Sequence, residues 1–324
     1  MKAYVYGANG AEITDVAKPT LKAHQVLVRV RACGLNRADL GMTKGHVHGR
    51  AGGAGTVLGM EWAGEVAEVG PDAKGVAVGD RVMGSGGAAF AEYTLADHGR
   101  LFHIPANANM SFEDAATLPV ALATMHNAVV TNGGLQPGQT VLIQGASSGV
   151  GLMAMQIAKL KGAKTVIGSS TDAMRRGRLK DFGADLAVDS SDPGWVDQVL
   201  KATNGEGVDL IVDQISGPVA NQNLKATRVK GRIVNVGRLG GTHGDFNFDL
   251  HAARRINYIG VTFRTRSIEE IREIFAEVRR DIWPAVESRK LQLPIDKAFA
   301  FDDIGKAFEH MEANKHLGKI VVTL

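Results

Sequence analysis

The stretch from residue 140 to residue 171 limits the possible folds more than any other part of the chain. It reads TVLIQGASSGVGLMAMQIAKLKGAKTVIGSST and opens on an apolar, β-branched run from Thr140 to Ile143. A turn rich in glycine and serine follows, and apolar residues then recur with a helical period up to Gly162. A second apolar run begins at Thr165. This order predicts a strand, a helix and a second strand, which together make a βαβ unit.

The turn inside this unit has the composition of a phosphate-binding turn. Glycine has no Cβ, so the backbone can approach a pyrophosphate closely, and the free N–H groups at the helix N-terminus stabilise its charge. We therefore expect a dinucleotide ligand. The residues predicted to hold it are Gly145, Ser147, Ser148, Gly149, Val150 and Gly151.

Two other nucleotide-binding motifs resemble parts of this sequence, but each lacks residues that the motif requires. The run from Gly133 to Gly138 has the spacing of a phosphate loop, but Gln139 stands where that loop requires lysine. The GASSGVG turn also fits the short-chain dehydrogenases, which need a tyrosine with a lysine four residues later. None of the four tyrosines has lysine at that offset, and the turn lies in the middle of the chain.

Composition and charge narrow the class of protein. A chain of 324 residues is long enough for two domains, and a net charge of +3 without a dense Lys/Arg stripe argues against a nucleic-acid partner. The N-terminus lacks an apolar leader, and no run approaches the roughly eighteen residues of a membrane span, so we expect a cytoplasmic protein. The single cysteine, Cys33, excludes an internal disulfide and is expected to be a small buried residue.

The remaining sequence predicts two kinds of architecture. Residues 1 to about 120 alternate short β-like runs with Gly, Asp and Pro turns, which predicts an antiparallel, partly barrelled domain. Two of these runs are Glu65 to Val69 and Ala91 to Leu95. An apolar stretch from Val120 to Val130, which follows Pro119, then predicts a helix. Strand and helix signals alternate beyond it, which predicts a doubly wound parallel sheet. The last segment predicts a helix over 267–290 with Ser267 as its N-cap, another helix over 302–313 and a final strand over 319–323 that returns to the first domain.

Ordered motifs along the whole chain resemble those of the medium-chain dehydrogenases/reductases, specifically the zinc-free quinone oxidoreductase branch. The motifs are LNRAD at 35–39, LGME at 58–61, GDRV at 79–82, FAEY at 90–93, LPV at 118–120, the GASSGVG turn and FGAD at 182–185. RTRS at 264–267, MEAN at 311–314 and GKIV at 318–321 are similar to the subgroup that contains the p53-inducible quinone oxidoreductase.

The resemblance implies an α/β fold with two domains. A GroES-like, mainly antiparallel catalytic domain would cover residues 1–121 and 264–324, and a Rossmann NADP(H)-binding domain would cover 122–263. It also implies cofactor contacts from Thr124, Gly237 and Phe263, and a homodimer. The run from Ile256 to Val261 could supply an exposed edge strand that pairs across the two-fold axis.

The chain departs from the zinc-dependent members of this superfamily at both ligand positions. Asn36 stands where they place a ligand cysteine and Met60 where they place a ligand histidine, and neither is a useful zinc ligand at such a site. We therefore predict no catalytic zinc. His46 and His48 could form a small metal site, but histidines in a glycine-rich loop are more typical of a solvated surface. Glu61 is open to two roles, a general acid or base and a structural hydrogen bond.

The resemblance implies an NADPH-dependent reductase that transfers hydride to a quinone or an enone. Without a metal, charge on the substrate oxygen must be met by protein donors, the ribose hydroxyl or water. We expect Asn36 and Arg264 to act there, with Thr43, Lys44, His46 and His48 as further donors. The alternatives are an alkenal or enoyl double-bond reductase and a nucleotide-binding protein without turnover. The loop LGMTKGHVHG has no tyrosine, so no quinone-contacting residue is transferred from related enzymes.

The choice of NADPH depends on the end of the second strand of the βαβ unit. NAD enzymes place a carboxylate there, whereas this strand ends at Ser169 and Ser170. Small hydroxyl residues leave room for a 2′-phosphate, and Arg175 and Arg176 could supply positive charge. Asp172 brings a negative charge close by, and Ser190 stands where NADPH-binding relatives often have tyrosine. The alternative places both arginines on a solvated helix face.

Overall fold

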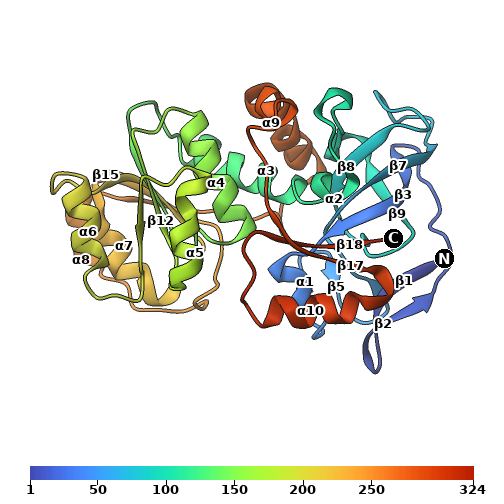
Figure 1. Cartoon of the computed structure of the whole chain (residues 1–324), viewed down its shortest axis with the longest axis horizontal. Coiled ribbons are helices and arrows are strands. Elements are labelled where there is room, and N and C mark those ends of the chain that lie inside the picture. Colours follow the sequence, from blue (N-terminus) through green and yellow to red (C-terminus); the bar gives the residue numbers. More distant parts are fainter. The chain divides into compact units, whose positions relative to one another are not determined.

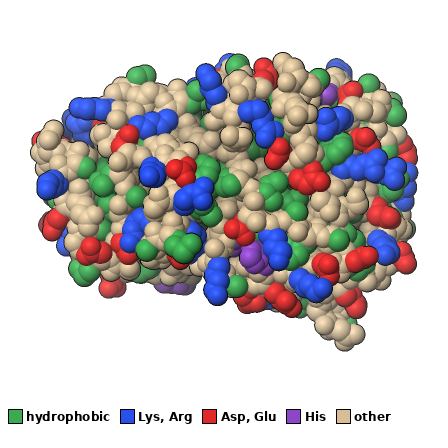
Figure 2. All heavy atoms as spheres, in the orientation of Figure 1, with side chains coloured by type: hydrophobic (Ala, Val, Ile, Leu, Met, Phe, Trp, Pro, Cys, Tyr) green, Lys and Arg blue, Asp and Glu red, His purple; other side chains and the backbone are tan.

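The computed structural model describes all 324 residues and divides the chain into two compact units (Figure 1). Unit 1 comprises Met1–Ala123 and Phe263–Leu324, and unit 2 comprises Thr124–Thr262. None of the helices has the length and apolar character needed to cross a membrane. Figure 2 shows acidic and basic side chains interspersed over the visible face, without a broad area of one sign.

Unit 2 is built on a six-stranded parallel sheet. The strand order is β13-β12-β11-β14-β15-β16, so the order reverses between β11 and β14. A reversal of this kind leaves a ligand-binding crevice at the carboxyl ends of the strands. The predicted doubly wound sheet is confirmed. The strands are β11 (Thr140–Ile143), β12 (Thr165–Ser169), β13 (Leu186–Val188), β14 (Val208–Asp213), β15 (Thr227–Asn235) and β16 (Asn257–Gly260).

Helices cover this sheet and bury its apolar strands on both faces. Leu142, Ile211 and Ile233 from three neighbouring strands are fully buried, as expected for a covered parallel sheet. Trp195, the first residue of α6, packs into the same core. The helices are α4 (Gly149–Leu160), α5 (Ala173–Arg178), α6 (Trp195–Ala202), α7 (Ala220–Ala226) and α8 (Phe248–Arg254), with short 3₁₀ segments at Leu179–Phe182 and Gly217–Val219.

The apolar stretch before the βαβ unit forms two kinds of helix. The sequence predicts one helical run over 120–130, whereas the structure has α3 (Pro119–His126) followed by a π-helix at Asn127–Asn132. In the π-helical turn, the Asn132 side-chain amide donates to the carbonyl of Asn127 and to its side-chain oxygen, at 3.0 Å each. These bonds span the wider turn, and periodicity alone does not reveal them.

Unit 1 is mainly antiparallel and confirms the GroES-like architecture. Its main sheet has the order β10-β8-β7-β3-β18-β17, with β9 also paired to β3, and only β17 and β18 run parallel. The strands of this sheet are β3 (Gln25–Gly34), β7 (Glu61–Val69), β8 (Arg81–Ser85), β9 (Tyr93–Asp97), β10 (Leu101–His103), β17 (Ile295–Ala300) and β18 (Lys319–Thr323). The final strand β18 pairs with β3, so the chain does return to the first domain.

Smaller elements complete unit 1. A three-stranded sheet contains β1 (Lys2–Gly7), β2 (Gly10–Asp15) and β6 (Thr56–Val57), and a short hairpin contains β4 (Val47–His48) and β5 (Ala51–Gly52). The helices are α1 (Arg37–Met42), α2 (Phe112–Ala115), α9 (Ile268–Glu287) and α10 (Ile304–Glu312), with 3₁₀ segments at His98–Arg100, Ala106–Ala108 and Phe301–Asp303. The predicted cap of α9 is confirmed, because the Ser267 hydroxyl accepts a 3.2 Å bond from the Glu270 amide.

Several strand limits differ from the sequence prediction. Strand β7 begins at Glu61, four residues before the predicted Glu65, because its first residues are buried on both faces and show no alternation. Strand β9 begins at Tyr93 rather than Ala91, and Ala91 forms an isolated bridge with Ala3. Period-two patterns mark only strands with one solvated face.

Candidate functional site

The glycine turn of unit 2 follows directly from β11 and leads into α4. Gly145 has a φ of +69°, which favours glycine. Gly151 lies in the first turn of α4, where an added Cβ would stand 2.7 Å from three backbone atoms of Gly145 and Ala146. The Ser148 hydroxyl caps the helix by accepting from the Gly151 amide at 3.1 Å. The two glycines therefore let the turn fold tightly against the helix.

Polar side chains at the carboxyl ends of β11, β12 and β14 form hydrogen bonds that support the turn. Gln144 is fully buried after β11, and its side chain accepts from the Ser169 hydroxyl of β12 at 2.6 Å. The Ser169 hydroxyl in turn accepts from the Gly145 amide at 3.0 Å. Gln214, which follows β14, donates to the Gln144 carbonyl at 3.1 Å and accepts from the Ser148 hydroxyl at 3.0 Å. We call Gln144, Ser148, Ser169 and Gln214 the turn-support network.

Three backbone N–H groups of the turn and of the first turn of α4 have no acceptor within the chain. Ser147, Gly149 and Val150 have no intramolecular acceptor for their amides, as expected at the beginning of a helix. Three N–H groups and the positive end of a twelve-residue helix form a cradle for an anion. A pyrophosphate fits this donor set, so the residues suit a dinucleotide.

The carboxyl end of β12 brings together most of the residues predicted to choose the cofactor. The Ser170 hydroxyl donates to the Ser147 hydroxyl at 3.1 Å. Arg176 donates to the Ser170 carbonyl at 2.8 Å and to the Asp189 carboxylate at 3.0 Å. Arg175 lies 3.6 Å from Asp172. These two bonds therefore hold the guanidinium of Arg176 at the carboxyl end of β12.

Three other predicted residues of this region have different surroundings. Asp172 caps α5, because its carboxylate accepts from the Arg175 amide at 2.8 Å. Ser190 is half-buried beside Asp189. Ser169 is fully buried, and its hydroxyl belongs to the turn-support network rather than to the open side of the turn. Its hydroxyl can therefore position the turn.

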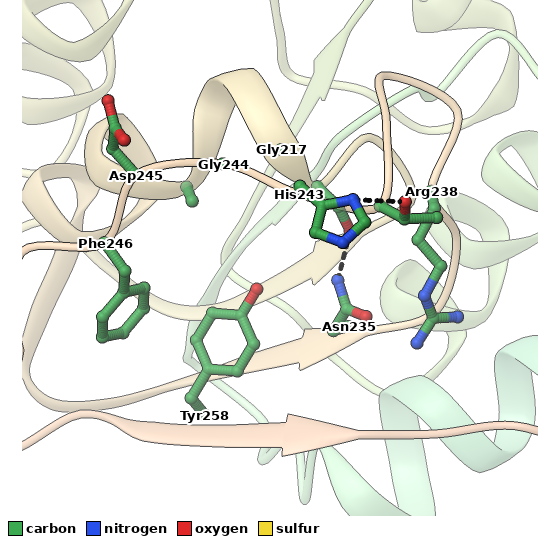
Figure 3. Close-up of a pocket in the computed structure, with 11 residues that line it drawn as sticks. Gly217, Asn235, Arg238, His243, Gly244, Asp245, Phe246 and Tyr258 are labelled. Atoms are coloured by element: carbon green, nitrogen blue, oxygen red, sulfur yellow. Dashed lines mark hydrogen bonds between the residues drawn. The ribbon is translucent and has the colours of Figure 1, made fainter.

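The loop after β15 carries Gly237 and rests on the end of β14. An added Cβ at Gly237 would lie 2.7 Å from the Gln214 carbonyl, so only glycine allows this approach. A cavity of about 210 Å³ opens beside the loop. Figure 3 shows Tyr258 and Phe246 on one side of it and His243 near Arg238 on the other. The two dashed lines are the bonds from Asn235 to Ser216 and between Thr242 and His243.

Unit 1 contains a buried polar cluster where β3, β7 and β18 end or begin. The Lys319 ammonium contacts a carboxylate oxygen of Glu61, and both side chains are almost completely buried. Asn36, which precedes α1, accepts from Lys319 at 3.1 Å and donates to the same Glu61 oxygen at 2.9 Å. The second Glu61 oxygen accepts from the Val120 amide at 2.9 Å. We call Asn36, Glu61 and Lys319 the amide cluster.

Two further buried groups lie beside the amide cluster. Asp39 accepts from the Asn36 backbone amide at 2.8 Å, while its other carboxylate oxygen has no hydrogen-bond partner. Burial raises the pKa of Asp39 to about 7, although the Asn36 amide and the Lys319 ammonium act in the opposite direction. Burial also raises the pKa of the Cys33 thiol, with added repulsion from Asp39 and Glu61. Cys33 is buried, as predicted, and the direction of its pKa shift disfavours the reactive thiolate.

Comparison with known proteins agrees with both units. A family described as alcohol dehydrogenase GroES-like domain matches residues 22–106, and one described as zinc-binding dehydrogenase matches residues 149–280. A solved alcohol dehydrogenase superfamily protein from Novosphingobium aromaticivorans is 30% identical, with a TM-score of 0.89 over 100% of this chain and 99% of that chain. This chain belongs to the medium-chain dehydrogenase/reductase superfamily.

Individual relatives narrow the position within the superfamily. Quinone oxidoreductase-like protein 2 of Bos taurus is 29% identical over 96% of this chain and 88% of that protein, so the chain is similar to a member of the quinone oxidoreductase branch. The low-reducing polyketide synthase drtA of Aspergillus calidoustus is 30% identical over 98% of this chain, which spans only 13% of that protein. The solved CurK enoyl reductase is 25% identical, with a TM-score of 0.87 over 99% of each chain. The chain is therefore similar to oxidoreductases of the superfamily, although it spans only 13–14% of the length of several polyketide synthases that it matches.

The superfamily's zinc-ligand positions hold Asn36 and Met60 in this chain. The Asn36 amide is engaged in the amide cluster, and Met60 is half-buried directly before Glu61. No group of three or more His, Cys, Asp or Glu side chains is arranged to hold a metal ion. The residues present at these positions do not fit a zinc ion of the kind that the superfamily's alcohol dehydrogenases bind.

The other predicted donors are distributed over the loop after α1. The Thr43 hydroxyl donates to the Leu40 carbonyl at 2.8 Å, and Lys44 pairs with Glu312. His48 lies in β4, where burial and the nearby Arg264 lower its pKa. His46 is exposed.

Arg264 lies against the hairpin of β4 and β5. An added Cβ at Gly49 would be 3.1 Å from the Arg264 backbone. Arg264 is exposed, and it does not join the amide cluster. Phe263, immediately before it, and Thr124 in α3 are half-buried. The structure therefore gives Asn36 and Arg264 separate surroundings within unit 1.

Two site residues escape prediction from the sequence. Lys319 is visible there only as part of the GKIV motif at 318–321, and Asp39 only as part of LNRAD. Their common feature is burial, since both side chains are almost completely covered. A lysine at the beginning of an apolar strand is the available signal, because a buried lysine requires a partner.

Proposed function

We propose that this protein is an NADPH-dependent, zinc-independent reductase that transfers hydride to a quinone or a conjugated carbonyl compound. The observation that carries the proposal is the Asn36 amide, an oriented neutral donor at a position where zinc-dependent relatives place a metal ligand. Its side-chain nitrogen donates to Glu61 at 2.9 Å and, through a longer 3.5 Å hydrogen bond, to the Gly34 carbonyl. The N–H group of the longer bond would donate instead to a substrate oxygen and stabilise the charge that develops there.

The cradle at the beginning of α4 would hold the pyrophosphate of the cofactor, which supplies the hydride when bound. Ser147, Ser148, Gly149 and Val150 would provide the backbone of that site. Ser170, Arg175 and Arg176 would surround the 2′-phosphate, and Thr124, Gly237 and Phe263 would contact the remainder of the molecule. The half-buried positions of the last three residues are compatible with this role.

A panel of acceptors tests the proposed function. Purified protein should oxidise NADPH when 1,4-benzoquinone, 1,2-naphthoquinone or an enone is added, and EDTA treatment should leave the rate unchanged. Asn36→Ala should lower kcat at least tenfold, since an oxyanion donor contributes on the order of 3 kcal/mol. Binding of NADPH without oxidation in the presence of any acceptor would instead identify a protein without turnover.

Product analysis separates the two enzyme classes. Reduction of a quinone yields a hydroquinone, whereas a double-bond reductase yields a saturated carbonyl with the transferred hydrogen on the β-carbon. The likeness to the CurK enoyl reductase supports the second candidate. Deuterium supplied from the nicotinamide C4 position locates the transferred atom by mass spectrometry.

The residues at the end of β12 predict the cofactor preference. Ser170→Asp should shift kcat/KM toward NADH, because a carboxylate repels the 2′-phosphate and can accept from ribose hydroxyls. Arg176→Ala should raise the KM for NADPH roughly tenfold to a hundredfold, as expected for lost charge-assisted hydrogen bonds, and leave the KM for NADH unchanged. Arg175→Ala tests the other arginine in the same assay.

Arg178→Ala is the matched control for these variants. Arg178 ends the same helix but is exposed and pairs with Asp181 at 2.6 Å. This variant should retain the wild-type KM for both cofactors. A wild-type kcat/KM for NADH that equals or exceeds the value for NADPH would refute the proposed pocket.

We also propose a homodimer in which β16 pairs with its counterpart in a second copy. The strand forms one edge of the unit 2 sheet, and Tyr258 on it is 38% exposed and packs on Phe246, which also contacts the 76% exposed Phe248. Multi-angle light scattering should give about twice the chain mass of 34.3 kDa, and Tyr258→Lys should weaken the dimer. A mass of one chain at micromolar concentration would contradict this.

A further inference from the structure

The amide cluster contains an ion pair that lies almost entirely out of water. The side chains of Glu61 and Lys319 are 0% and 6% exposed. Removing two charges from water is costly unless the remaining hydrogen-bonding groups are satisfied, so a buried pair is weak evidence for a purely stabilising role. Its location beside a proposed substrate donor suggests a different purpose.

The backbone around the ion pair leaves room for it. Gly34 ends β3, the strand between β7 and β18 in the sheet, and it pairs with Glu61 on one side and Val321 on the other. An added Cβ at Gly34 would stand 2.8 Å from a Glu61 carboxylate oxygen and 2.4 Å from the Ala116 carbonyl. The end of β3 therefore has no side chain where the carboxylate lies.

The ion pair determines which way the Asn36 amide faces. Lys319 donates to the amide oxygen at 3.1 Å, and Glu61 accepts from the amide nitrogen at 2.9 Å. A flipped amide would place its N–H₂ group against the ammonium and its oxygen against the carboxylate. Both contacts would be repulsive, since an ammonium only donates and a carboxylate only accepts. One orientation is thus favoured at both ends of the amide.

We propose that Glu61 and Lys319 are positioning residues that hold the Asn36 amide with its second N–H group directed to the substrate oxygen. This inference rests on the proposed function, in which Asn36 donates to that oxygen. An asparagine without such partners would populate both amide orientations and present an oxygen to the substrate part of the time. Glu61 and Lys319 themselves transfer no proton and contact no reacting atom.

A double-mutant cycle tests the proposal. Lys319→Met should lower kcat at least tenfold in the wild-type background. In an Asn36→Ala background the same substitution should change kcat less than twofold, because the residue acts through the amide. NADPH affinity, measured by fluorescence titration, should stay within twofold of wild type in all four proteins. Equal losses of kcat in both backgrounds would overturn the proposal, as would a loss confined to NADPH affinity.

Two further variants guard against general damage to the fold. Lys319→Arg keeps a cationic donor for the Asn36 oxygen and should retain more of the wild-type kcat than Lys319→Met. Lys297→Met removes an exposed lysine from the neighbouring strand β17 and should leave kcat unchanged. If Lys319→Met does not fold, Glu61→Gln takes its place in the cycle, because it removes the charge and retains an oxygen. Full activity in Lys319→Met or Glu61→Gln would reject the positioning role.

An activity-free measurement separates this inference from the proposed function. The Asn36 side-chain amide signals, assigned by their absence in Asn36→Ala, should shift in the ¹H–¹⁵N spectrum of Lys319→Met while most backbone signals remain. If the wild-type protein reduces no acceptor but this shift occurs, the proposed function fails and the fixed amide orientation stands. Unchanged Asn36 signals in Lys319→Met would show that the ion pair does not orient the amide.

Discussion

Substitution of Gly151 with alanine is expected to reduce NADPH affinity more than tenfold and to lower the thermal midpoint by several degrees. The new Cβ would stand 2.7 Å from three backbone atoms, the Ala146 Cα and the carbonyl oxygens of Gly145 and Ala146. Real Cβ atoms essentially never approach other atoms this closely, and backbone cannot move aside as a flexible side chain can. Overpacking of this kind costs about 1–3 kcal/mol. The turn must also shift, which misaligns the amides that would hold the pyrophosphate.

Gly177→Ala provides the control for this substitution. Gly177 lies in α5 of the same unit, and an added Cβ there would meet no atom within 4 Å. Alanine is the better helix former, so this variant should equal or exceed the stability of the wild type by up to about 1 kcal/mol. Isothermal titration with NADPH and a thermal melt should be run on both variants. Wild-type NADPH affinity in Gly151→Ala would contradict the assignment of this turn as the phosphate site.

Replacement of Asp39 with asparagine is expected to stabilise the protein at alkaline pH. The pKa of Asp39 is raised by burial from an ordinary value of 3.8 to about 7. Below about pH 4 the carboxyl is protonated in both the folded and the unfolded chain, so it does not change the free energy of unfolding. Between pH 4 and 7 only the unfolded chain loses the proton, so the free energy of unfolding falls as the pH rises. Above pH 7 the full difference of about 4 kcal/mol opposes folding.

Asparagine removes this ionisation and keeps an oxygen that can accept from the Asn36 amide. The Tm of Asp39→Asn should therefore exceed that of the wild type at pH 8, by the equivalent of about 1–4 kcal/mol, and the gap should narrow at pH 5.5. Asp72→Asn, at an exposed aspartate in the turn after β7, should leave Tm unchanged at both pH values. A Tm difference for Asp39→Asn that did not widen with pH would refute the raised pKa.

The parts of the fold that can be predicted from sequence are those governed by local chemistry. The first strand and the glycine turn of the βαβ unit lie where the sequence predicts them, because periodicity, glycine and the Gly162 stop act within a few residues. The final strand from Lys319 to Thr323 also matches its predicted limits. The π-helix from Asn127 to Asn132, which extends beyond the end of the 120–130 run, escapes prediction, since side-chain bonds rather than periodicity mark it.

In the candidate site, too, some features can be predicted from local sequence and others depend on contacts between distant residues. The turn residues can be named from the motif, but the support from Gln214 comes from a side chain about seventy positions further along the chain. Lys319 and Glu61 are 258 positions apart, and the pairing of both β18 and β7 with β3 brings them together. Ser169 shows the limit most clearly, because its residue type suits a cofactor contact whereas its burial gives it a supporting role. Sequence patterns identify the residue types of a site, while tertiary pairing decides which atoms face outward.

The turn-support network has a consequence for the dynamics of ligand binding. Its bonds hold Gly145 and Ser148 through contacts within the chain itself, so the conformational entropy of the turn should be lost when the chain folds and not when a dinucleotide binds. The Gly145 amide should then exchange slowly with deuterium in the free protein, whereas the Ser147 and Val150 amides should exchange rapidly until an anion covers them. Association should accordingly be limited by diffusion and ligand orientation, without a slow ordering step in this part of the protein.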